Sequence, residues 1–141
     1  MKRRNAILGA LVPIAIGGPL ASANAQEKEN EEQDSRKQLL LQRSAVLQER
    51  VELIQFQYDA GGVSLEKLIK AQNEYLLSQL DLRDTRAAKM ELLLKRFRGL
   101  QQLEEIASKK HEAGVTSLDE VLYAKACRLE AQIALLDARN E

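Results

Sequence analysis

Few residues in this chain have side chains that could take part in catalysis or hold a metal ion. There is one histidine, His111, and one cysteine, Cys127. Acid–base catalysis by His111 would need a partner group within hydrogen-bond reach, and the nearby Glu112 and Asp119 are acids of the kind expected at a solvated helix end. One histidine and one cysteine make no metal site of the Cys/His type. We therefore expect no catalytic, cofactor-binding or metal-binding residue.

The other residues of chemical interest also have plain structural interpretations. Adjacent acids such as Glu31-Glu32 and Glu104-Glu105 fit polar helix faces. Cys127 could form an intermolecular disulfide in an oxidising compartment, and the simpler interpretation is an unpaired thiol. The sequence has no Gly-rich phosphate loop, no His-Glu-x-x-His and no nucleophile elbow. The sequence thus predicts a protein that is not an enzyme.

The composition predicts an all-α protein of one domain. The chain has 141 residues, of which 45% are apolar, 30% are charged and only 4% are aromatic. Leu, Ala, Glu, Gln, Lys and Arg dominate, and these residues favour helices, whereas a small β-sandwich needs more aromatic and β-branched residues. Lys and Arg together number 21, as do Asp and Glu. This zero net charge gives no basic patch for nucleic acid.

The N-terminus has the pattern of a secretory signal peptide. Lys2, Arg3 and Arg4 precede a short apolar stretch and the small residues up to Ala25, which is the arrangement recognised by export machinery. We expect cleavage after Ala25, a flexible acidic leader over 26–34, and a mature chain without a transmembrane segment. Loss of three basic residues gives the mature chain a net charge of −3. The predicted location is the periplasm or cell envelope of a Gram-negative-type bacterium.

The rest of the chain predicts three long helices joined by two glycine turns. Apolar residues recur with the helical period over 35–58, 65–111 and 118–139. Gly61 can take the left-handed position that ends the first helix, and Ser64 can cap the second. Ser117 and Glu120 form a capping box for the third helix. We expect elongated antiparallel hairpins with coiled-coil packing; whether the middle helix breaks near Gly99 is left open.

The two turns belong to an internal repeat. Residues 58–72 align with 111–125 without a gap, at an offset of 53 residues from Asp59 to Glu112, and periods of this size indicate repeated supersecondary units. The helical domain over 35–141 would then contain two copies, at about 45–85 and 98–138. Because one uninterrupted helix joins the two turns, they are expected at its opposite ends.

The repeated turn resembles the motif of outer-membrane efflux proteins of the TolC type. That motif has an aromatic residue, an acidic-Ala-Gly sequence, two variable residues, a Ser and then an acidic residue with Val-Leu and Ala-Gln. In that family it forms the periplasmic tip of a helical tunnel, where the pump's adaptor protein docks. The family's subunits are longer, add strands to a membrane barrel and place both tips at one end, whereas this chain has no alternating segment suited to such a strand. By resemblance the hairpin-tip residues are Tyr58, Asp59, Gly61, Gly62, Ser64, His111, Glu112, Gly114 and Ser117.

The resemblance implies a secreted periplasmic helical protein with an efflux-related or accessory role through protein–protein contacts, its partners being a pump adaptor or channel. Two alternatives are a periplasmic coiled-coil chaperone that holds unfolded clients and a structural protein of the cell envelope. A two-helix hairpin has little core of its own, so a homo-oligomer is also expected. No cofactor is predicted.

Overall fold

The computed structural model describes residues 19–141, and this part of the chain is all-α. Its four helices are α1 (Pro19–Asp59), α2 (Leu65–Leu80), α3 (Arg86–Glu112) and α4 (Leu118–Asn140). The expected signal peptide lies largely in residues 1–18, outside the described residues. No helix among residues 19–141 is long and apolar enough to cross a membrane.

The chain divides into two units at residue 34, within α1. Residues 26–34, for which the sequence suggested a flexible leader, are helical in the structure, and each of them is exposed. They carry no apolar side chain that a core could bury. The second unit, residues 35–141, contains the end of α1 and the other three helices.

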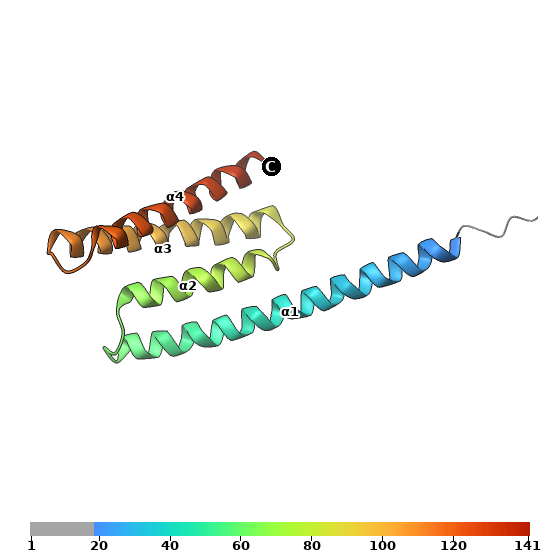
Figure 1. The fold of residues 1–141 in the computed structure, drawn as a ribbon, viewed down its shortest axis with the longest axis horizontal. Helices are drawn as coiled ribbons and strands as arrows, with labels where there is room; N and C mark the ends of the chain where they lie inside the picture. The colour runs from blue at the N-terminus through green and yellow to red at the C-terminus, as the bar shows by residue number, and fades with distance from the viewer. Residues whose placement is uncertain (1–18) are drawn as a thin grey trace, which may run out of the picture. The chain divides into compact units, whose positions relative to one another are not determined.

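Within residues 35–141 the helices follow one another as antiparallel neighbours (Figure 1). Arg50 of α1 pairs with Glu74 of α2, and Ser44 of α1 accepts a hydrogen bond from Gln79 nearer the end of α2. An earlier residue of α1 thus contacts a later residue of α2, which shows that the two helices pack antiparallel.

The same alternation continues through the last two helices. Arg96 of α3 donates to the side chain of Asn73 of α2, with 3.0 Å between Nε and Oδ1. Arg86, at the start of α3, donates from Nε to the carbonyl of Ala138 near the end of α4 at 3.0 Å. The unit is therefore an up-and-down array in the order α1, α2, α3, α4.

Two apolar clusters hold this array together. A small cluster of Ile54, Leu68 and Ala71 joins α1 to α2. The larger cluster joins α2, α3 and α4, and its buried members are Ile69, Leu100, Leu103, Ala107, Ala124 and Ala131. The alanines let α3 and α4 approach closely, since a small side chain leaves room for the neighbouring backbone. Burial of a leucine such as Leu100 contributes about 2 kcal/mol.

The prediction of one middle helix over 65–111 is wrong, because α2 ends at Leu80 and α3 begins at Arg86. No large apolar residue lies between Leu82 and Met90, so a continuous helix there would have nothing to bury. Thr85 instead caps α3: its hydroxyl accepts a hydrogen bond from the backbone N–H of Ala88 at 3.3 Å. The turn lets α3 fold back on α2, which buries the faces of both helices.

The helix does not break at Gly99, which lies inside α3. A Cβ placed on Gly99 would stand 3.8 Å from Cγ2 of Ile69 on α2. This is an ordinary van der Waals distance, so a Cβ would fit between α2 and α3 without displacing Ile69.

Candidate docking tips

The two glycine turns fold in the same way. We call residues 58–72 the first tip and residues 111–125 the second tip. In the first tip Gly61 has φ +75°, and its N–H donates to the carbonyl of Tyr58 at 2.9 Å while the N–H of Gly62 donates to that of Gln57 at 2.7 Å. This pair of bonds is the Schellman motif, which satisfies carbonyls left open at a helix end.

The second tip repeats these bonds one repeat later. Gly114 has φ +72°, and its N–H donates to His111 at 2.9 Å while the N–H of Val115 donates to Lys110 at 2.8 Å. The left-handed position falls on Gly61 and Gly114, as the sequence predicts for Gly61. The position after it is Gly62 in one tip and Val115 in the other, so only the first of the two glycines is required by its φ.

Serine caps begin the helix that follows each turn. Ser64 accepts a hydrogen bond from the backbone N–H of Lys67 at 3.3 Å, and Ser117 accepts one from the N–H of Glu120 at 3.4 Å. The carboxylate of Glu120, which a capping box would direct back to the Ser117 backbone, instead lies 3.9 Å from Nζ of Lys70. One half of the expected capping box is therefore present.

His111 serves the second turn structurally. Its Nδ1 lies 3.0 Å from the carbonyl oxygen of Thr116, and because that oxygen can only accept, the ring nitrogen donates. The ring is exposed, and Glu112 and Asp119 make no hydrogen bond or ion pair with it. No group of three or more His, Cys, Asp or Glu residues within 19–141 is arranged to hold a metal ion.

The two tips lie at the same end of the unit, so the prediction of opposite ends is wrong (Figure 1). Its cause is the unforeseen turn at 81–85: α3 returns along α2 and brings residue 112 back to the level of the first turn. Glu66 of the first tip pairs with Lys110, just before the second tip, at 3.1 Å. Lys70 reaches Glu120 of the second tip, and this cross-helix contact ties the two tips together.

A small groove lies between the tips, lined by residues of both. Nζ of Lys70 stands 5.7 Å from the centroid of the Tyr123 ring, a distance suited to a cation–π contact. A side-chain hydrogen bond with Cys127 raises the pKa of the Tyr123 phenol above its usual value. The groove is lined by Glu66, Lys70, Leu103, Ala107, Thr116, Glu120, Tyr123 and Ala124.

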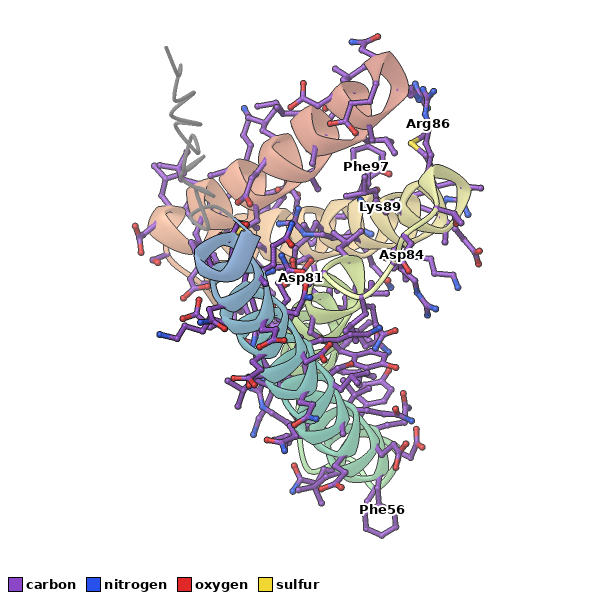
Figure 2. The ribbon with its side chains drawn as sticks, turned by 90° about the vertical axis from the view of Figure 1, so that its right-hand side faces the viewer. Phe56, Asp81, Asp84, Arg86, Lys89 and Phe97 are labelled. Atoms are coloured by element: carbon purple, nitrogen blue, oxygen red, sulfur yellow. The ribbon has the colours of Figure 1, made fainter. Side chains whose placement is uncertain are left out.

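Two apolar side chains in or beside the tips are exposed, and the sequence pattern does not single them out. Val115, in the second turn, is 72% exposed, and Phe56, just before the first turn, is 73% exposed. Figure 2 shows Phe56 projecting away from the ribbon. Burial of these side chains against a protein partner would be favourable, because it would remove their apolar surface from water. Their spacing gave no signal, because Phe56 and Val115 do not occupy equivalent positions of the repeat.

Comparison of the chain with family models, with curated proteins and with solved structures finds no match to any of them.

Proposed function

We propose that this protein is an exported helical protein that docks, through its paired tips, onto a helical partner of an export assembly in the periplasm. The observation that carries the proposal is the placement of both tips at one end of the unit, joined by Glu66–Lys110 and Lys70–Glu120. The efflux proteins whose motif the tips resemble present both tips at one end in the same way. The role is efflux-related or accessory, with a pump adaptor or channel as partner.

Three features of the tips favour binding of a protein partner over catalysis. Each turn combines a Schellman motif with a serine cap, so its backbone is already held by hydrogen bonds and little order has to be gained on binding. Val115 and Phe56 offer exposed apolar contacts. The apolar cluster that joins α2, α3 and α4 sets the spacing of the tips, which gives a partner hairpin a defined surface.

The proposal is tested with the isolated helical hairpin of a periplasmic pump adaptor from the same cell as the probe. Calorimetry should detect binding to the wild-type chain and a loss of about tenfold in affinity for Val115→Asp, since a buried valine contributes about 1.5 kcal/mol. Asp84→Lys changes an exposed residue in the α2–α3 turn, which lies at the end of the unit opposite the tips (Figure 1), and this variant should bind normally.

A second measurement is made in cells. Deletion of the gene should raise sensitivity to drugs or metals, and the wild-type gene but not Val115→Asp should restore resistance. If no adaptor hairpin binds and deletion leaves sensitivity unchanged, the docking role is wrong. Binding of unfolded outer-membrane polypeptides in its place would favour the chaperone.

A further inference from the structure

A small hollow lies in the seam between α2 and α3. Its volume is about 30 Å³, which is room for one or two water molecules or for one monoatomic ion. Ile69, Leu76 and Gly99 give it an apolar wall, and its polar lining residues are Gln72, Asn73, Lys95 and Arg96.

Arg96 brings a buried positive charge to this hollow. It is the one charged residue that is buried in the described part of the chain, and its side chain is 5% exposed. Its Nε donates to Oδ1 of Asn73 at 3.0 Å, and its Nη2 donates to Oε1 of Glu130 at 3.2 Å. Its Nη1 has no acceptor among residues 19–141. Because a buried N–H of a charged group is costly to leave without an acceptor, we expect an acceptor that the chain itself does not supply.

The position of Nη1 agrees with this expectation. Within residues 19–141 no fully buried side-chain nitrogen or oxygen lacks a hydrogen-bond partner. Nη1 must therefore lie where a water molecule or an ion can reach it, and the hollow that Arg96 lines provides such a space.

The other polar groups around the hollow are also donors. The Oδ1 of Asn73 is occupied by Arg96, so the amide nitrogen of Asn73 is the group that it has left to offer. Gln72 is exposed, and its amide can turn an N–H inward. Nζ of Lys95 lies 3.1 Å from Oε1 of Glu91, and this contact uses one of its three N–H groups.

No carboxylate of the described residues lines the hollow. The acids that pair with its two cations are Glu91 and Glu130, and their side chains are 69% and 70% exposed. A cation in the hollow would meet two positive charges and no negative one. A water molecule can accept only two hydrogen bonds, whereas an anion accepts more, and its bonds to charged donors are the stronger ones.

The internal repeat shows that packing alone does not require these donors. One repeat earlier, the position of Arg96 is taken by Arg43, whose side chain is 57% exposed. One repeat later, the position of Asn73 is taken by Ala126. The buried arginine and its amide partner thus belong to the α2–α3 seam and not to the repeated fold.

We propose that the hollow between α2 and α3 binds one small monovalent anion of the chloride type. Arg96, Lys95 and the side-chain amides of Gln72 and Asn73 would donate to it. Because the ion joins groups of both helices, it should stabilise the folded chain. The inference does not depend on the docking function, which is read from Val115→Asp.

Urea unfolding of the full chain tests for the ion, with sodium chloride compared with sodium gluconate at equal ionic strength. Gluconate is too large for the hollow, and equal ionic strength keeps the screening of surface charges constant. A site that is half saturated at about 50 mM chloride should lower the unfolding equilibrium constant about elevenfold at about 0.5 M chloride. Equal stability in the two salts would mean that the hollow holds only water, and would overturn the proposal.

A carboxylate placed among the donors should replace the ion. Gln72→Glu changes an exposed residue that lines the hollow, so it should abolish the chloride dependence and raise the stability in gluconate. Gln101→Glu makes the same change at an exposed site of α3 outside the hollow, and it should keep the elevenfold effect. If Gln72→Glu kept the dependence too, chloride would act elsewhere and the proposal would be wrong.

Bromide locates the ion directly, because it has an anomalous X-ray signal and is only slightly larger than chloride. Crystals of the chain grown in sodium bromide should show an anomalous peak within hydrogen-bond reach of Nη1 of Arg96. Peaks confined to other surface sites would indicate an adventitious ion only, and would refute the site. Neither result bears on binding of an adaptor hairpin.

Discussion

The glycines of α3 and of the second turn should respond in opposite ways to the same substitution. Gly114 has φ +72°, and a Cβ placed there meets no atom within 4 Å. The cost of Gly114→Ala is therefore conformational, about 1 kcal/mol. Gly99 is helical, and its Cβ would stand at an ordinary 3.8 Å from Ile69. Gly99→Ala should stabilise the fold by about 1 kcal/mol, because alanine favours a helix interior.

Urea unfolding followed by far-ultraviolet circular dichroism measures both changes. The two variants should differ by about 2 kcal/mol in free energy of unfolding, with the wild type between them. In thermal unfolding Gly114→Ala should lower Tm by roughly 5 °C. Gly114→Asn is the matched control, and it should recover part of the loss because asparagine tolerates the left-handed region. A neutral Gly114→Ala, or a destabilising Gly99→Ala, would refute the reasoning.

Three further predictions concern the core, the third turn and the buried arginine. Leu100→Ala should lower the free energy of unfolding by about 3 kcal/mol, read from the urea midpoint, because Leu100 is only 2% exposed. Thr85→Ala should cost about 1 kcal/mol through the lost cap, and an unchanged midpoint would mean that the cap adds nothing. Asn73→Ala should cost about 2 kcal/mol, since it leaves an N–H of the buried Arg96 unpaired. Glu130→Ala should cost less than about 1 kcal/mol in the same assay, because the side chain of Glu130 is 70% exposed.

The helical class and the two glycine turns could be predicted because each has a local cause. A positive φ requires a residue such as Gly61, and a helix start favours a hydroxyl such as that of Ser64. Both signals lie within a few residues of the feature that they produce. The repeat then made the second turn predictable from the first.

The third turn escaped prediction because it contains neither glycine nor proline. Its signals are weak: Asp81, Asp84 and the cap residue Thr85, together with a gap in the apolar stripe. A gap of that length can also occur on an exposed stretch of one long helix. What decides between the two is the free energy gained when α3 packs on α2, and no local pattern records that contact.

The candidate site shows how one missed turn changes a functional interpretation. The turns that follow Asp59 and Glu112 were predicted correctly, but their positions relative to one another were not. Glu66 and Lys70 look like ordinary surface charges in the sequence, and only the reversal at 81–85 brings them to Lys110 and Glu120. The placement of the tips was thus beyond local reasoning.

The direction of α4 has a practical consequence for labelling. Because α4 runs from the second tip to Asn140, Glu141 lies at the end of the unit away from both turns. A fluorophore or affinity handle attached there leaves the tips free to meet a partner.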